Sequence, residues 1–316
     1  MDFRKSTDTF VSRDGKTAVA CYFYEPLEEP VGVVQISHGM CEYLERYEEF
    51  AGYLCQRGFA VCGNDHLGHG RTAAAPEDLG FFGEKGGGDL LVEDLKQLTD
   101  LAKKRYPGLP YFLFGHSMGS FVARMYLSRY GGELTGAVIC GTTGGNPMAG
   151  MGALLAGVTA SVKGPRHRSA LLTKMAFGSY NRRFDPAEGG SAWLSRDWEI
   201  VQKYDADPWC TFQFTAAAYR ELFTLVKRVS AKSWAKSVPK DLPVLLMAGE
   251  DDPVGGYGKG VRRVAARLLD AGLRDVSCRM YPDCRHEVLN ELNRRDVYQE
   301  VCRWLQARLE TDECAR

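Results

Sequence analysis

Residues 110–130 read PYFLFGHSMGSFVARMYLSRY, and this stretch decides the fold. Its first part, 110–114, is short, apolar and aromatic, as expected of a buried strand, and its last part, 120–130, carries apolar residues at helical spacing. Between them lies the pattern G-x-S-x-G, with Ser117 at its centre. A strand, a serine between two glycines and a helix predict a sharp turn that presents the Ser117 hydroxyl at a helix N-terminus. Backbone N–H groups and the helix dipole favour a developing anion there. The alternative is a glycine-rich turn with an idle serine.

Strand and helix patterns alternate on both sides of this turn. We expect strands at 18–24, 31–37, 59–64, 110–114 and 135–141, and helices at 46–56, 89–106 and 120–130. The alternation resumes with strands at 242–249 and 276–281 and helices at 261–271 and 297–309. Such alternation predicts an α/β fold, with a mostly parallel central sheet and helices on both faces.

Residues 144–237 interrupt the alternation. This stretch is helical, irregular and aromatic, and it holds 13 Lys or Arg against 7 Asp or Glu, which gives it a charge of +6. Because strand and helix patterns return after it, we expect a core formed by 1–143 and 238–316, with 144–237 inserted as a helical cap, or lid. Its aromatic residues indicate either a pocket for an apolar group or a small core within the cap itself.

The composition excludes several classes of protein. The chain has 316 residues, 45% of them hydrophobic and 25% charged, with a formal net charge of zero. This is ordinary globular composition, and it gives no support to nucleic-acid binding. The polar N-terminus, 1–10, indicates no signal peptide, and no stretch has the length and apolar character of a membrane-spanning helix. The chain has ten cysteines and no C-x-x-C pair, which is typical of reduced thiols in a cytoplasmic protein.

A serine hydroxyl needs a base to become a nucleophile, and a carboxylate to orient that base. In the architecture of this elbow the chain order is serine, acid, histidine, so the base must follow Ser117. Only His167 and His286 do so. His286 directly follows the last predicted strand, at the edge of the sheet where open α/β proteins place their sites, and we expect it to be the base. His167 lies in a basic run that is more typical of a solvated surface.

The acid is expected in the turn after the strand at 242–249. Three carboxylates compete there, namely Glu250, Asp251 and Asp252. Asp252 is preferred because Pro253 fixes the backbone beside it and lets the turn direct this side chain toward the histidine. Asp251 remains the alternative, and the other carboxylates would then serve as turn or cap residues.

An oxyanion formed on Ser117 needs two backbone donors. The N–H of Met118, the residue after the nucleophile, is one of them. The second is expected in the loop after an early strand, where Gly39 permits close approach and the N–H of Met40 is the donor. His38 precedes the nucleophile, so we expect it to support this loop through hydrogen bonds.

Residues 65–70, DHLGHG, offer an acid and two histidines as metal ligands. No matching Cys or His pair accompanies them, so a structural turn is expected in place of a zinc site. The chemistry outlined above requires neither a metal nor an organic cofactor.

Several of these motifs occur together in one known family. They are 38–40 with Glu42, Arg46 and Tyr47, then 64–71, 115–119, 252–254 and 285–287. In them the chain resembles the α/β-hydrolases of the monoacylglycerol lipase and lysophospholipase-like family, which is also grouped with serine aminopeptidases.

The resemblance extends over nearly the full length of the chain. It implies Ser117 as nucleophile, Asp252 as acid and His286 as base, with Met40 and Met118 in the oxyanion hole. It also implies that 144–237 is a lid that lines an acyl-chain tunnel. One departure is Tyr43, where monoacylglycerol lipases usually have histidine, and this leaves the ester preference open.

Together these observations predict a cytoplasmic serine hydrolase that cleaves carboxylic esters through an acyl-enzyme. A small acyl ester such as a monoglyceride or lysophospholipid is the expected substrate, and the basic lid suggests transient contact with a membrane surface. An amidase or peptidase with the same triad, and an esterase for short-chain or aromatic esters, are the alternatives. A non-catalytic binding protein would normally lack one triad member, whereas all three candidates are present.

Overall fold

The computed structural model describes residues 3–309 and arranges their strands in one eight-stranded sheet, in the order β1-β2-β4-β3-β5-β6-β7-β8. The strands are β1 (Arg4–Val11), β2 (Ala18–Glu25), β3 (Gly32–Ser37), β4 (Phe59–Asn64), β5 (Tyr111–His116), β6 (Gly136–Cys140), β7 (Val244–Gly249) and β8 (Val276–Tyr281). β2 runs antiparallel to both β1 and β4, and every other pair is parallel. The predicted mostly parallel sheet is therefore confirmed.

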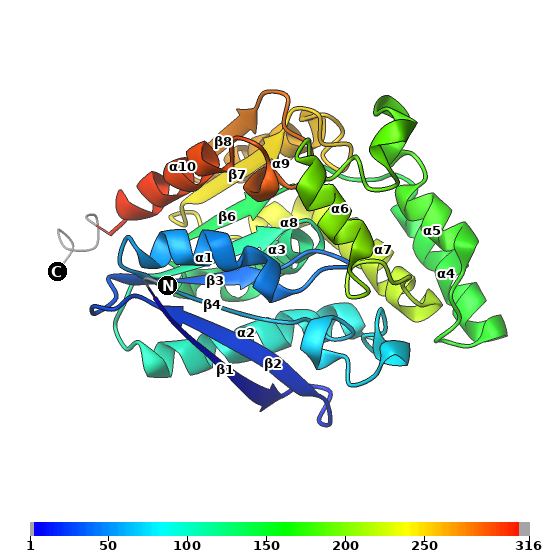
Figure 1. Cartoon of the computed structure of the whole chain (residues 1–316), viewed down its shortest axis with the longest axis horizontal. Helices are drawn as coiled ribbons and strands as arrows, with labels where there is room; N and C mark the ends of the chain where they lie inside the picture. Colours follow the sequence, from blue (N-terminus) through cyan, green and yellow to red (C-terminus); the bar gives the residue numbers. More distant parts are fainter. Residues whose placement is uncertain (1–2, 310–316) are drawn as a thin grey trace.

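Helices cover both faces of the sheet, as Figure 1 shows. α1 (Glu48–Cys55) and α10 (Arg294–Gln306) pack on one face, and α2 (Gly87–Arg105), α3 (Met118–Tyr130) and α9 (Lys259–Asp270) pack on the other. Successive side chains of β5 alternate between the two layers, with Phe112 and Phe114 on the side of α1 and Leu113 on the side of α3. The central strands are buried on both faces, which explains why they read as continuous apolar runs.

The segment between β6 and β7 contains α4 (Ala149–Lys163), α5 (Ala170–Phe177), α6 (Trp198–Ala206), α7 (Ala216–Ser230) and α8 (Lys232–Lys236). α4 packs along α7, and α7 in turn contacts α2 and α3. In Figure 1 α4 to α7, green to yellow-green, gather beyond one end of the sheet, at the carboxyl ends of the parallel strands, while α8 lies beside α3. The segment thus stands over the edge where the predicted functional residues lie.

The expected and observed elements differ mainly at their ends and at the N-terminus. No strand was predicted over 1–10, yet β1 forms there as an edge strand whose side chains are mostly exposed, so it shows no apolar alternation. The helix expected from Arg46 begins as a 3-10 turn over Leu44–Tyr47 and becomes α-helical at Glu48. The last helix begins three residues earlier than expected, at Arg294.

The composition led to expectations about membrane-spanning helices and about the cysteines, and both concern residues 3–309. None of the helices described there is both long and apolar enough to cross a bilayer. The nine cysteines in this range are free thiols, all of them buried except the half-buried Cys278. Cys314 lies outside the described residues.

Candidate active site

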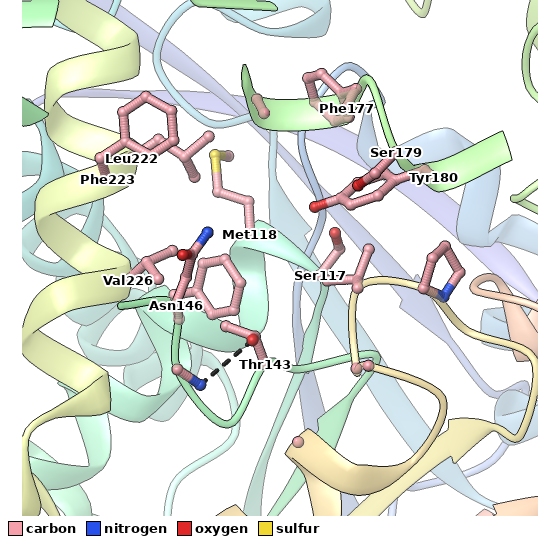
Figure 2. Close-up of a pocket in the computed structure, with 18 of the residues that line it drawn as sticks. Ser117, Met118, Thr143, Asn146, Phe177, Ser179, Tyr180, Leu222, Phe223 and Val226 are labelled. Carbon is pink, nitrogen blue, oxygen red and sulfur yellow. Dashed lines mark hydrogen bonds between the residues drawn. The ribbon is translucent and has the colours of Figure 1, made fainter. Parts of the chain in front are cut away.

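Ser117 occupies the turn between β5 and α3 in a conformation that few residues adopt. Its φ of 52° and ψ of −120° are unusual for a residue with a side chain, and its N–H donates to the carbonyl of Cys140 at 3.0 Å. A Cβ added to Gly119 would collide with the carbonyl oxygens of Ser37 and His38, and one added to Gly115 would lie 2.7 Å from the Gly119 carbonyl. The glycines are therefore required, as the motif predicts, and the turn directs the Ser117 hydroxyl into a cavity (Figure 2).

His286 and Asp252, from the loops after β8 and β7, form a buried pair. The Nδ1 of His286 lies 2.9 Å from Asp252 Oδ1, and that oxygen also accepts from the Val254 N–H at 2.8 Å. Asp251 is half-buried, and Glu250 is exposed and pairs with Arg262 at 3.7 Å. Asp252 is thus the carboxylate of this turn that contacts His286.

The other ring nitrogen of His286, Nε2, makes no bond to Asp252. It is buried and has no hydrogen-bond partner within residues 3–309. Its ring packs between His116, at a centroid distance of 4.9 Å, and Trp193, at 5.0 Å. His286 and Ser117 line the same cavity. With Nδ1 donating to Asp252, Nε2 is an acceptor and is able to take a proton from a hydroxyl group there.

His167 lies elsewhere. Its backbone carbonyl accepts from the N–H of Ala216 at 2.7 Å, where α7 begins, so it belongs to the connection between α4 and α5. It is half-buried, so the expected solvated position is only partly correct.

The loop 38–42 brings a second set of backbone groups to Ser117. His38 Nδ1 donates to the Gly39 carbonyl at 2.8 Å, and its Nε2 accepts from the His66 N–H at 2.9 Å. Burial lowers the pKa of His38, which favours this neutral form. The Gly39 carbonyl and the Met40 N–H belong to one planar peptide unit and point in opposite directions, so the first bond also fixes the second group. The predicted supporting role of His38 is confirmed.

Gly39 allows this loop to approach the serine closely. A Cβ at this position would lie 3.0 Å from the Cβ of Ser117 and would collide with Glu42. Met40 and Met118 both line the cavity that contains Ser117.

The 65–70 segment forms a structural turn, as predicted. The Asp65 carboxylate accepts from the hydroxyl of Tyr22 and from the N–H groups of Leu44 and Arg71, each at 2.8 Å. These bonds use both carboxylate oxygens and hold the turn against β2. In the part of the chain that the structure describes, no group of three or more acidic, His or Cys side chains is arranged to hold a metal ion.

Two cavities meet at Ser117. The first chamber, of about 430 Å³, is lined on one side by apolar residues of α3, α5 and α7 (Figure 2), namely Met118, Phe121, Met175, Leu222, Phe223 and Val226. The second chamber, of about 440 Å³, has both apolar and polar residues in its lining, the latter including Glu42, His116, Thr173, Tyr204, Gln213, His286 and Glu287, whereas the first also has Lys259 and Arg263 in its lining. A substrate that reacts at Ser117 can therefore extend into two environments.

Residues 177–194 of the segment between β6 and β7 were not assigned individually from the sequence, yet they form a wall over Ser117. Phe177, Tyr180 and Trp193 line the first chamber, and the Trp193 carbonyl accepts from the His286 N–H at 3.3 Å. In Figure 2 the hydroxyl of Tyr180 points toward Ser117. Burial, together with the negative charge of Asp252, raises the pKa of the Tyr180 phenol. The aromatic bias of 144–237 was the available signal, and these three aromatic residues line a pocket, whereas Trp234 packs on Arg124 of α3, outside the cap.

The chain is similar to known proteins over most of its length. The family model described as "Serine aminopeptidase, S33" matches residues 28–293. The monoacylglycerol lipase of Mycolicibacterium smegmatis is 30% identical over 290 residues, which cover 90% of this chain and 92% of the relative. Human monoglyceride lipase is 28% identical over 307 residues, covering 95% of this chain and 90% of the relative. The solved structure of a thermostable carboxyl esterase from Bacillus coagulans, in complex with glycerol, superposes with a TM-score of 0.90 at 31% identity, covering 98% and 99% of the two chains.

Proposed function

The chain belongs to the serine aminopeptidase S33 family of α/β-hydrolases, and we propose that it hydrolyses carboxylic esters of lipids, foremost monoacylglycerols. One observation carries the chemistry. His286 is bonded to Asp252 through Nδ1, its Nε2 is buried without a hydrogen-bond partner in residues 3–309, and His286 and Ser117 line the same cavity. The relatives named above are lipases and an esterase, which favours ester over amide bonds.

In the proposed reaction Ser117 attacks the acyl carbonyl while His286 Nε2 takes the hydroxyl proton. Asp252 remains ionised and stabilises the imidazolium, and the N–H groups of Met40 and Met118 bind the oxyanion. Collapse of this intermediate breaks the ester bond, and His286 returns the proton to the leaving alcohol. Water then attacks the acyl-enzyme with His286 again as base, which releases the acid and restores the serine.

The two chambers suggest how a monoacylglycerol is oriented. The apolar side of the first chamber suits an acyl chain, because burying each methylene contributes about 0.8 kcal/mol. The hydroxyl and amide groups of the second chamber, on Thr173, Thr211 and Gln213, suit the alcohol, and the related Bacillus esterase was solved in complex with glycerol. Placing the ester at their junction brings the carbonyl to Ser117.

We also propose that 144–237 acts as a lid that touches the surface of a lipid aggregate. α4 carries exposed apolar side chains at helical spacing, at Met151, Leu154, Val158 and Val162. The charge of +6 on this segment would favour an anionic surface.

A cytoplasmic location is proposed from the nine free cysteines. Cell fractionation with an epitope-tagged chain tests it, and recovery outside the cytoplasm would contradict it.

The reaction is tested with purified protein on monoacylglycerols of graded chain length, with p-nitrophenyl acyl esters and aminoacyl-arylamides alongside. Ser117→Ala is the control for contaminating activity. We expect ester turnover with an optimum at medium or long chains and none in the control. Faster arylamide hydrolysis would favour a peptidase, and an optimum at acetate would favour a short-chain esterase. Either result would overturn the proposed substrate.

A further inference from the structure

A buried cluster of charged side chains lies beneath Ser117 and takes no direct part in the steps above. At its centre is Arg46, whose Nη1 lies 2.9 Å from Glu42 Oε2 and 2.8 Å from Glu287 Oε1. Its Nη2 lies 2.8 Å from Glu287 Oε2. The Arg46 side chain is 12% exposed and those of both glutamates are 4% exposed. One guanidinium thus binds two carboxylates that are 245 residues apart in the chain.

Each carboxylate belongs to a loop that carries a reacting group. Glu42 accepts from the N–H of Gly39, the residue before Met40. Glu287 directly follows His286, and its own N–H donates to the Leu194 carbonyl at 2.7 Å. Through Arg46, the loop that bears an oxyanion donor is therefore joined to the loop that bears the base.

The nucleophile is joined to the same cluster. Glu42 Oε1 accepts from the Tyr47 hydroxyl at 2.8 Å and from Nδ1 of His116, the residue before Ser117, at 3.1 Å. The cluster therefore contacts a chain neighbour of each of three groups that meet at the reaction centre, namely Met40, Ser117 and His286.

Arg46 and His116 favour the ionised form of the two buried glutamates. Burial on its own would raise the pKa of Glu42, but the hydrogen bond from His116 and the charges of His116 and Arg46 lower it below its usual range. Burial opposes ionisation of Glu287 too, and Arg46 outweighs it to lower that pKa. For His116, burial favours the neutral form, yet the bond to Glu42 raises the pKa overall. Arg46 thus faces two carboxylates whose pKa values are lowered, and removing it leaves a buried charge without a partner.

We propose that Arg46 is a positioning residue for ester hydrolysis, because by binding Glu42 and Glu287 together it holds the Met40 loop and the His286 loop in register around Ser117. The inference rests on the proposed function. A displacement of about 1 Å at a reaction centre costs on the order of 100-fold in rate, so a fixed distance between the two loops matters for catalysis even though Arg46 does not touch the reacting atoms.

The competing explanation is that the cluster only stabilises the fold. Asp94 provides a matched control, because it is a buried carboxylate that joins distant segments by accepting from the Ser12 hydroxyl and the Arg13 N–H, both at 2.7 Å. It lines neither chamber. Asp94→Asn should lower thermal stability without changing turnover per folded molecule.

The experiment compares Arg46→Met, Arg46→Lys, the charge-balanced pair Arg46→Met/Glu287→Gln and Asp94→Asn. Turnover of a p-nitrophenyl acyl ester is measured below each melting temperature, and active sites are counted by the acylation burst. For Arg46→Met and for the double variant we expect kcat to fall about 100-fold with KM changed less than about threefold, and for Arg46→Lys we expect part of the loss to be restored.

The double variant keeps the test decisive if Arg46→Met does not fold, since it does not leave a second carboxylate unpaired. Loss of thermal stability with kcat within about threefold of wild type, as for Asp94→Asn, would overturn the positioning role. If the wild-type chain hydrolyses no ester, the proposed function itself fails, and that failure is distinct because it precedes any comparison of variants.

Discussion

Two parts of the segment between β6 and β7 are attached to the molecule in different ways. Residues 188–214 are hydrogen-bonded to both loops around Ser117. The carbonyls of Trp193 and Leu194 accept from the N–H groups of His286 and Glu287, at 3.3 and 2.7 Å. At the other loop, which contains Met40, the Tyr43 hydroxyl donates to the Asp207 carboxylate at 2.7 Å. Residues 188–214 are therefore attached to the site by hydrogen bonds.

α4 is attached by packing alone. Its small residues Gly152, Ala156 and Ala160 face α7, and a Cβ added to Gly152 would lie 3.0 Å from the Phe223 ring. In the described range 3–309, no hydrogen bond or ion pair joins α4 to another element of secondary structure. The other face carries the exposed apolar side chains. One insertion therefore combines a wall that shapes the reaction centre with a helix that is held by close packing on α7 and exposes apolar side chains on its outer face.

The largest effect is expected when the Trp193 side chain is removed from the wall over Ser117. Trp193→Ala removes the indole that packs on the His286 and Tyr180 rings, at 5.0 and 4.9 Å. We expect kcat/KM for monoacylglycerol to fall about 100-fold because the base loses its support, with a stability loss of about 2 kcal/mol. Steady-state kinetics and thermal unfolding measure the two effects.

Trp198→Ala is the control, because Trp198 lies in the same segment but is 47% exposed. Its stability should stay within about 0.5 kcal/mol of wild type. Equal losses of activity in the two variants would mean that the wall has no special relation to His286.

A smaller effect is expected on the outer face of α4. Leu154 and Val158 are 70% and 52% exposed, so replacing both with serine should leave the stability nearly unchanged. We expect hydrolysis of vesicle-borne monoacylglycerol to fall about tenfold, and that of soluble p-nitrophenyl acetate to stay the same. Leu292→Ser, at an exposed position outside the insertion, is the control. Loss of both activities, or of neither, would contradict a surface-binding role for α4.

A weaker effect is expected where Asp207, in the part 188–214, contacts Tyr43 next to the Met40 loop. Tyr43→Phe removes the hydrogen bond to Asp207, and a bond to a charged group contributes about 1.5–3 kcal/mol. We expect kcat/KM to fall about fivefold, because the loop keeps its other supports. Tyr130→Phe removes a similar bond, to Glu93, at the far end of α3 and should leave kcat/KM unchanged. If both substitutions change kcat/KM alike, Tyr43 has no link to the reaction centre.

The smallest effect concerns the pH dependence of stability. Although burial favours the neutral imidazole, Glu42 raises the pKa of His116 above its usual value, and Glu42, Arg46, Tyr47 and Glu287 surround it. The folded state thus holds a proton that the unfolded state releases at about pH 6.5. The contribution of His116 to the free energy of unfolding is complete below that pH and is lost as the pH rises through the folded-state pKa. Denaturant unfolding of wild type and His116→Asn from pH 6 to 9 should show a steeper decline for wild type, and parallel curves would contradict this.

The central sheet and the serine, acid and histidine candidates could be predicted from the sequence because both leave local signals. Buried parallel strands read as apolar runs, and the glycines around Ser117 are required by contacts that the structure describes. The catalytic roles of Ser117, Asp252 and His286 stay predictions until activity is measured. Three adjacent carboxylates could not be separated by pattern alone, since the backbone of the turn decides which one meets His286.

Other features left no such signal. β1 is an exposed edge strand, so its side chains do not alternate. Glu42, Arg46 and Glu287 belong to the motifs of the family resemblance, but nothing in their spacing predicts that the tertiary fold brings them together as a buried cluster. Trp193 lies in an irregular stretch with no periodicity from which its contact with His286 could be inferred.

The activation of Ser117 by His286 is tested most directly by reaction with an alkyl fluorophosphonate, followed by intact mass measurement and peptide mapping. The account predicts one adduct per chain, on Ser117, with a labelling rate about 1,000-fold lower or more in His286→Ala. Labelling at another residue, or an equal rate in His286→Ala, would contradict it.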